Sequence, residues 1–141
     1  MGLGMSFKIK NDALKAMIED CRKGYPNEAC GYLIGNSDTA SETFPIGNDQ
    51  ESPTSYLMNP KDQIQAEQAM RQKGLKTLAI YHSHVATEAY PSQRDIQHAK
   101  SIQEFFDGKY VLVTLEDEKN PGTRVFTILD GEVSEESWQA V

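Results

Sequence analysis

Residues 75–95 read LKTLAIYHSHVATEAYPSQRD, and this stretch organises the rest of the chain. Its first part, residues 75–83, is largely apolar and predicts a strand at the centre of a sheet. A loop follows at residues 85–91, and Ser92 is a residue type that caps helices, so we expect a helix from there to about Phe106. This order puts the end of a buried strand next to the first turn of a helix.

Two of the three histidines stand at the end of that strand, at positions 82 and 84. Because residues two apart on a strand point to the same face, His82 and His84 can present two imidazoles to one ion. Asp95 lies in the first turns of the next helix, which the loop allows to fold back. Two imidazoles and one carboxylate suit Zn²⁺, and three protein ligands leave the open position of a catalytic site. We therefore predict a zinc site at His82, His84 and Asp95.

Hydrolysis at such a site also needs a base and a donor to the developing oxyanion. Glu28 is the candidate base, since it precedes residues 29–35 (ACGYLIG), a run that predicts a buried strand. If this strand neighbours the one at 75–83, Glu28 faces the metal. Glu28 taken alone would be an exposed carboxylate. The Ser92 hydroxyl is the candidate oxyanion donor, with helix capping as its rival role.

The remaining segments predict a mixture of helices and strands around one sheet. We expect a first helix, capped by Asn11 or Asp12 and stopped by Gly24 and Pro26. Asn59 followed by Pro60 predicts the start of a half-exposed helix to about residue 73. Further strands are expected at residues 41–46, 55–58, 109–115 and 124–129. The pattern predicts an α/β (α+β) fold, a mixed β-sheet flanked by helices, in a single domain spanning residues 1–141.

Composition narrows the classes of partner. The chain has 14 Lys and Arg against 21 Asp and Glu, a formal charge of −7, which argues against nucleic acid. No apolar stretch approaches the roughly 20 residues of a membrane helix, and the N-terminus lacks the apolar core of a signal peptide. We therefore expect a cytoplasmic protein that binds neither nucleic acid nor membranes. The oligomeric state is left open.

Several residues have plainer interpretations. Cys21 and Cys30 are too few for a disulfide framework and lack metal-site spacing, so both are expected to be small buried residues. The alternative for Cys30 is a place near the active site, since it follows Glu28 by two positions. His98 is expected to be structural or solvent-facing, and the acidic residues of 132–136 to form a solvated tail.

The spacing His82-Ser83-His84, seven residues, Ser92, two residues, Asp95 reads H-S-H-x7-S-x2-D. With Glu28 upstream, it resembles the motif of the JAMM (MPN+) zinc metallopeptidases, and the resemblance covers most of the chain. It implies a cytidine-deaminase-like sheet flanked by helices and hydrolysis of peptide or isopeptide bonds. It also implies that His82, His84 and Asp95 bind zinc, that Glu28 is the base and that Ser92 assists the intermediate.

A narrower resemblance involves residues 81–95, 109–113 and the Asp130-Gly131 turn. These are similar to short bacterial JAMM peptidases of the sulfur-carrier–cysteine type. That similarity implies a small ubiquitin-like (β-grasp) sulfur carrier as substrate, cleaved at its C-terminal tail with release of an amino acid, typically cysteine. The alternative is a catalytically silent scaffold or protein-binding module of the same fold, and metal content separates the two.

Overall fold

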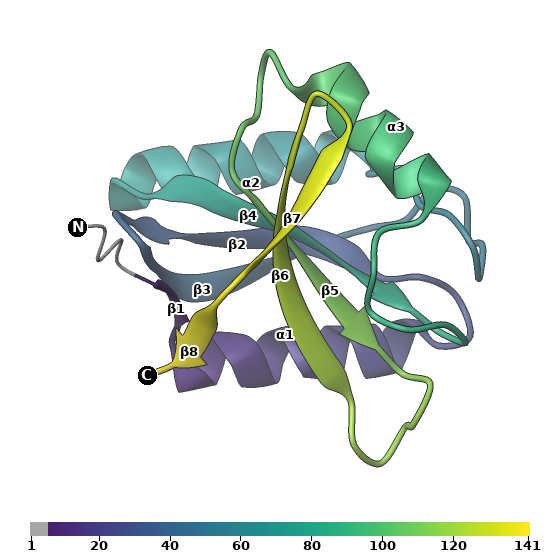
Figure 1. The fold of residues 1–141 in the computed structure, drawn as a ribbon. Helices are drawn as coiled ribbons and strands as arrows, with labels where there is room; N and C mark the ends of the chain where they lie inside the picture. Colours follow the sequence, from purple (N-terminus) through teal and green to yellow (C-terminus); the bar gives the residue numbers. More distant parts are fainter. Residues whose placement is uncertain (1–5) are drawn as a thin grey trace.

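The computed structural model describes residues 6–141, which form one mixed sheet with three helices (Figure 1). The helices are α1 (Asn11–Gly24), α2 (Pro60–Lys73) and α3 (Gln93–Ile102). The strands are β1 (Phe7–Ile9), β2 (Cys30–Asn36), β3 (Thr39–Ile46), β4 (Lys76–His84), β5 (Lys109–Thr114), β6 (Gly122–Leu129), β7 (Glu132–Glu136) and β8 (Trp138–Ala140). In this part of the chain, no helix is long and apolar enough to cross a membrane.

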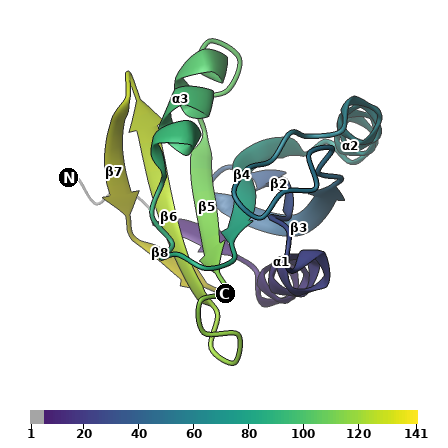
Figure 2. The same ribbon diagram turned by 90° about the vertical axis from the view of Figure 1, so that its right-hand side faces the viewer.

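The sheet has the strand order β7-β6-β5-β4-β2-β3-β1-β8. β4 runs parallel to β5, β1 runs parallel to both β3 and β8, and the other neighbours are antiparallel. The two edge strands, β7 and β8, are separated in sequence only by Ser137. The sheet must therefore curl until its edges approach each other, as Figures 1 and 2 show.

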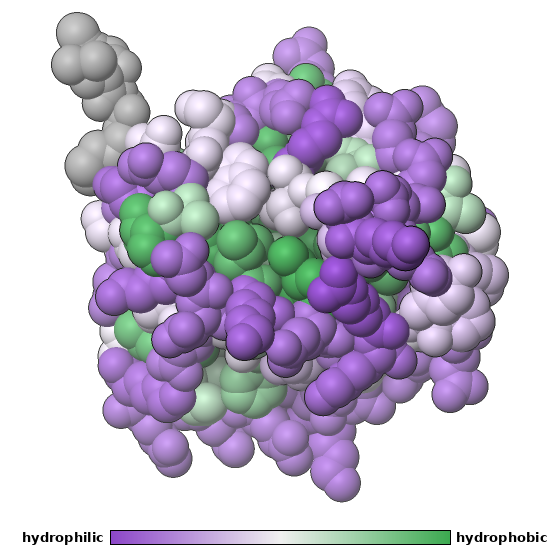
Figure 3. Space-filling model, turned by 90° about the horizontal axis from the view of Figure 1, so that it is seen from below, coloured by the Kyte–Doolittle hydropathy of each residue, from purple (hydrophilic) through white to green (hydrophobic). Residues whose placement is uncertain are grey.

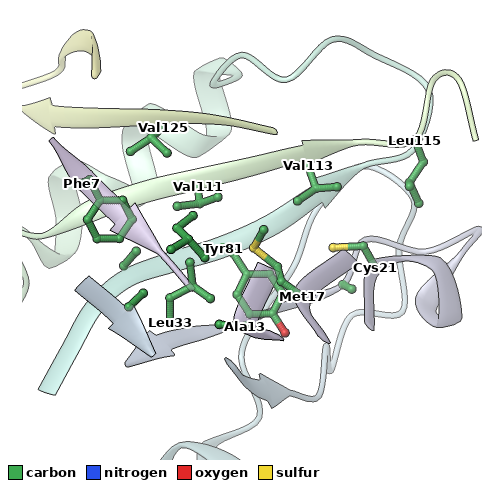
Figure 4. Packing of buried hydrophobic residues seen from close by; sticks show 14 residues of the cluster. Phe7, Ala13, Met17, Cys21, Leu33, Tyr81, Val111, Val113, Leu115 and Val125 are labelled. Carbon is green, nitrogen blue, oxygen red and sulfur yellow. The ribbon is translucent and has the colours of Figure 1, made fainter. Parts of the chain in front are cut away.

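The helices cover both faces of the sheet (Figure 2). Met17 and Cys21 of α1 pack against Leu33, Val111 and Val113 on one face (Figure 4). The apolar residues of α2 and α3 pack on the opposite face, around Ile80 and Tyr110. Seen from the α1 side, the surface is mostly hydrophilic, with a band of hydrophobic residues across its middle (Figure 3). Burial of these two apolar layers is the main force that holds the sheet and helices together.

β4 is the strand that positions the site. β2 and β5 flank it on its two sides, and His82 pairs with Cys30 of β2 and with Leu112 of β5. Its last six residues are buried. Buried residues on both faces explain why this strand is a continuous apolar run in the sequence rather than an alternating one.

The expected mixed sheet flanked by helices is confirmed. The strands expected at 75–83 and 29–35 are β4 and β2, shifted by one residue. The helix expected from Asn59 is α2: the Asn59 side chain accepts a hydrogen bond from the backbone of Asp62, and Gly74 ends the helix with φ of 67°. Of α2, only Ala66 is buried, as its thin apolar stripe predicted.

The expected cap of the first helix is wrong. Asn11 is the first residue of α1, and Lys10 stands at the N-cap without a side-chain hydrogen bond. The backbone N–H of Asn11 instead donates to the carbonyl of Val141, 2.8 Å away. The backbone of Val141 supplies the partner that a capping side chain supplies elsewhere.

The strand expected at 55–58 is also wrong, and this segment is a loop with one isolated bridge between Asn48 and Met58. Two backbone groups of this segment bond a side chain and not a neighbouring strand: the Asn48 side chain donates to the carbonyl of Ser55 and accepts from the N–H of Leu57.

Two further expectations, on where α3 ends and on the acidic residues of 132–136, are wrong. α3 ends at Ile102 rather than near Phe106. The Gln103 side chain, just after the helix, donates to the Asp130 carboxylate and accepts from the backbone N–H of Asp130. The acidic residues of 132–136 are not a tail but strand β7, paired with β6. Their charges find partners across the sheet: Glu135 binds Arg124, and Glu136 lies 3.3 Å from Lys109.

Candidate metal centre

The end of β4 and the start of α3 bring three possible metal ligands together. His82 and His84 are 1% and 5% exposed, and Asp95 reaches them from α3. Nε2 of His82 lies 3.1 Å from one carboxylate oxygen of Asp95, and Nε2 of His84 lies 3.0 Å from the other. One donor atom from each of the three residues lies within 4.8 Å of the others. This spacing allows a single cation to contact all three atoms.

His84 is oriented by the loop between β4 and α3. Its Nδ1 lies 2.8 Å from the carbonyl oxygen of Glu88, so Nδ1 donates a hydrogen there, and Nε2 faces Asp95 Oδ2 at 3.0 Å, on the side where a metal would bind. The loop is tied to the sheet, since the Thr114 hydroxyl donates to the carbonyl of Thr87 at 2.6 Å. Arg124 lies 3.6 Å from the Glu88 carboxylate. The loop thus selects the tautomer of His84.

Asp95 is oriented by a capping box at the start of α3. The Ser92 hydroxyl oxygen accepts from the backbone N–H of Asp95 at 3.1 Å, and the backbone N–H of Ser92 donates to Asp95 Oδ2 at 2.9 Å. Burial acts to raise the pKa of Asp95, but the two imidazoles and this N–H outweigh it, and the pKa lies well below its usual range. Asp95 is therefore anionic at neutral pH, the form that can bind a metal ion.

Three polar atoms at this site are buried without a hydrogen-bond partner: Nδ1 and Nε2 of His82 and Oε1 of Glu28. Although His82 Nε2 lies close to Asp95, the two do not form a hydrogen bond. A buried polar atom without a partner is costly unless a ligand satisfies it. The orphaned Nε2 of His82 converges with Nε2 of His84 and the Asp95 carboxylate, and a set of two imidazole nitrogens and one carboxylate fits a bound Zn²⁺.

Glu28 lies just before β2, which pairs with β4, and its side chain is 5% exposed. Burial raises the pKa of its carboxyl to about 7, against the opposing attraction of His82 and His84. A carboxyl with a pKa close to neutral can both accept and donate a proton. The structure thus places Glu28 close enough to His82 and His84 for their charges to act on its carboxyl, although the three residues are far apart in the sequence.

The raised pKa has a consequence for stability. Folding raises the pKa of Glu28 from 4.5 to about 7, so the folded protein favours its protonated form. The stability that this preference contributes is present below pH 4.5 and is lost as the pH rises to about 7. In metal-free protein, Glu28→Gln should therefore raise the free energy of unfolding by about 2–3 kcal/mol at about pH 8 and leave it nearly unchanged at about pH 4. Urea unfolding at both pH values measures this difference, and equal effects at both would contradict it.

Tyr56, which lies next to the site, was missed from the sequence, and it contacts His98, which was expected to be structural or solvent-facing. The ring of Tyr56 packs against the imidazole of His82 with centroids 4.7 Å apart, and its hydroxyl lies 3.2 Å from Nδ1 of His98. His98 is thus half-buried and structural, one side chain removed from His82. Tyr56 lies in the segment 55–58, which was expected to be a strand. The sequence pattern there gave no indication that the Tyr56 ring packs against His82.

Both cysteines are buried, as expected. The alternative for Cys30 also holds, because Cys30 pairs with His82 across β2 and β4. Its thiol donates to the carbonyl of Ile46, and burial raises its pKa to about 12, so Cys30 is a neutral thiol at physiological pH.

Comparisons with known proteins agree with this geometry. A family model described as prokaryotic homologues of the JAB domain matches residues 10–129. A CysO-cysteine peptidase of Mycobacterium tuberculosis is 38% identical over 130 residues, covering 91% of this chain and 86% of the relative. A probable TtuB-protein conjugate cleaving protease of Thermus thermophilus is 40% identical over 91 residues, 61% of each chain.

Among solved structures, a protein from Desulfitobacterium hafniense superimposes with a TM-score of 0.83 at 30% sequence identity. The superposition covers 95% of this chain and 92% of that one. The match therefore includes nearly all of the curled sheet and not just the motif at the end of β4.

Proposed function

Because the chain belongs to the family of prokaryotic homologues of the JAB domain, we propose that it is a zinc-dependent peptidase acting on a small ubiquitin-like sulfur carrier. It hydrolyses the bond after the C-terminal tail of the carrier and releases cysteine. The observation that carries the proposal is the convergence of donor atoms from His82, His84 and Asp95 within 4.8 Å, with a buried carboxyl, Glu28, in the same neighbourhood. The names of the two relatives, a peptidase and a conjugate-cleaving protease, support the substrate class.

His82, His84 and Asp95 would hold the ion. Zn²⁺, when bound, acts as a Lewis acid toward the scissile carbonyl and makes water a better nucleophile. Glu28 accepts the proton of the attacking water and later donates it to the leaving amine, two steps for which a pKa of about 7 is suited. The Ser92 hydroxyl is exposed, and its oxygen accepts from Asp95 while its hydrogen remains free to donate to an oxyanion.

An apolar groove supports a protein substrate, although its lining reaches the site only through His98. It lies between α2 and α3, has a volume of about 1030 Å³ and includes His98 in its lining. Three large apolar side chains on its rim, Leu57, Ile64 and Phe105, are 55%, 56% and 86% exposed. Apolar surface of this kind next to a catalytic site suits a folded partner better than a free amino acid derivative. The single-domain organisation and the cytoplasmic location stay predictions.

Ser92→Ala separates the two roles of this residue. Loss of the capping hydroxyl should lower the free energy of unfolding by about 1 kcal/mol. Loss of the oxyanion donor should lower kcat about 10²-fold with zinc content unchanged. Ser92→Asp keeps a capping oxygen but removes the donor, so it should restore the stability without restoring kcat. Recovery of kcat in the aspartate variant would contradict the oxyanion role and leave capping as the whole function of Ser92.

The proposed function is tested with a β-grasp carrier extended by one cysteine at its C-terminus, with release followed by mass spectrometry. We expect cleavage by the zinc-loaded protein, loss of cleavage after chelation and recovery on adding Zn²⁺. A carrier attached through its C-terminus to a lysine side chain tests isopeptide cleavage in parallel. If the zinc-loaded protein cleaves neither substrate but binds the carrier, the chain is a binding module and not a peptidase.

A further inference from the structure

The loop between β3 and α2 reaches back to the segment that carries Glu28. Asn48 is the centre of this loop. Its side-chain amide donates to the carbonyl of Glu28 at 2.9 Å and to the carbonyl of Ser55 at 3.0 Å. Its side-chain oxygen accepts from the backbone N–H groups of Gln50, at 3.0 Å, and Leu57, at 2.9 Å. One half-buried side chain thus connects four backbone groups of two separate segments.

The same loop holds the other backbone group of Glu28. The N–H of Glu28 donates to the carbonyl of Ser52 at 2.8 Å, and Ser52 lies within the turn that Asn48 closes. Both main-chain polar groups of Glu28 are therefore fixed by residues 48–52. On the other side, the backbone N–H of Ala29 donates to the hydroxyl of Ser83, at 2.9 Å, between the two histidines of β4.

These backbone contacts matter because no hydrogen bond holds Oε1 of the Glu28 side chain. Its Oε1 is buried without a hydrogen-bond partner, so the backbone must determine where the carboxyl lies. Glu28 precedes β2 and lacks the ladder hydrogen bonds that hold Cys30 against His82. The position of the carboxyl relative to the histidines thus depends on the loop and on Ser83.

We propose that Asn48 is a positioning residue, which places Glu28 for proton transfer by holding its carbonyl and closing the turn that binds its N–H. This inference rests on the proposed role of Glu28 as the base. Asparagine suits the task because its amide offers two donors and its oxygen two acceptor sites, and all four are used. Aspartate at this position would keep the acceptors but place an oxygen against the carbonyls of Glu28 and Ser55.

The test compares Asn48→Asp and Asn48→Ala with the parent protein, with a carrier–cysteine fusion as substrate. Both variants lose the amide's bonds to the carbonyls of Glu28 and Ser55, but only one adds a charge, so an effect common to both comes from the lost amide and not from the charge. We expect kcat to fall about tenfold or more in each, with KM within about twofold and close to one zinc per chain, since displacing a catalytic group by about 1 Å can cost about 10²-fold.

Asn120→Asp is the matched control. Asn120 is exposed in the turn between β5 and β6, where its amide donates to Asp117 Oδ2 at 3.2 Å. The substitution makes the same change of atoms and charge, and it touches neither the Glu28 segment nor residues 48–52. We expect kcat within about twofold of the parent protein, because the position of Glu28 does not depend on this amide.

Amide hydrogen exchange provides a readout that does not depend on catalysis. Protection of the Glu28 amide should fall in Asn48→Asp and stay at the parent level in Asn120→Asp. Unchanged protection, unchanged kcat, or a loss that appears in KM or zinc content alone would each overturn the positioning role. Full activity of Glu28→Gln would instead refute the base assignment of the proposed function, and exchange at Glu28 would still report whether Asn48 holds that segment.

Discussion

Glu28→Gln should bind close to one zinc per chain and lose about 10²–10⁴-fold in kcat. The amide has nearly the shape of the carboxyl, so the buried pocket should accept it. It has no acidic proton to exchange, so it can neither accept the proton of the attacking water nor deliver one to the leaving amine. Metal binding should survive because the three converging donor atoms belong to His82, His84 and Asp95 and not to Glu28.

The measurement is kcat on a carrier–cysteine fusion, together with elemental analysis of the same preparation. Retained turnover with zinc bound would show that another group serves as the base. Loss of zinc together with turnover would show instead that Glu28 helps to hold the metal. Because the same variant should stabilise the metal-free protein above about pH 7, a loss of activity cannot be attributed to unfolding.

His82→Ala should lose both the metal and the activity. With its imidazole removed, only His84 and Asp95 remain, and two protein ligands do not retain Zn²⁺ in a stable tetrahedral site. We expect less than about a tenth of the zinc content of the parent protein, and turnover lower by about 10³-fold or more. The removed side chain is nearly fully buried, so the variant should also be less stable by a few kcal/mol in the presence of zinc.

His98→Ala is the control for this experiment. His98 is the third histidine of the chain, and it contacts Tyr56 rather than the three converging residues. Elemental analysis should therefore find close to one zinc per chain in His98→Ala. Equal zinc in the parent protein and in His82→Ala would refute the ligand assignment, and zinc in neither, even after its addition, would favour the scaffold alternative.

Local patterns predicted the elements that carry the site. Histidines two apart at the end of an apolar run predict two side chains on one face of a strand, and β4 has them there. Ser92 predicted a helix cap, and α3 starts there, with Ser92 and Asp95 forming a capping box. Asn59-Pro60 and Gly74 predicted both ends of α2. Each of these signals acts within a few residues, where local geometry is nearly independent of the rest of the chain.

The predictions that failed concern features that depend on contacts between distant segments. The cap of α1 is the carbonyl of Val141, and the bonds that replace a strand at residues 55–58 come from Asn48. The acidic residues of β7 pair with a strand whose own partners come from earlier in the chain. Contacts between distant segments leave no periodic pattern at either end, so the sequence offers no signal for them.

The sequence by itself determined which residues could bind a metal, because the motif's donor types and spacing restrict the chemistry to an open zinc site. Only the tertiary structure decided that Glu28, the candidate base, is buried beside the two histidines, since a lone glutamate is ordinarily exposed and its burial depends on β2 pairing with β4. The position of its carboxyl follows from Asn48, Ser52 and Ser83, which approach from other segments. Hydrogen bonds across the fold, formed only once the sheet is assembled, thus complete a site that the sequence had only outlined.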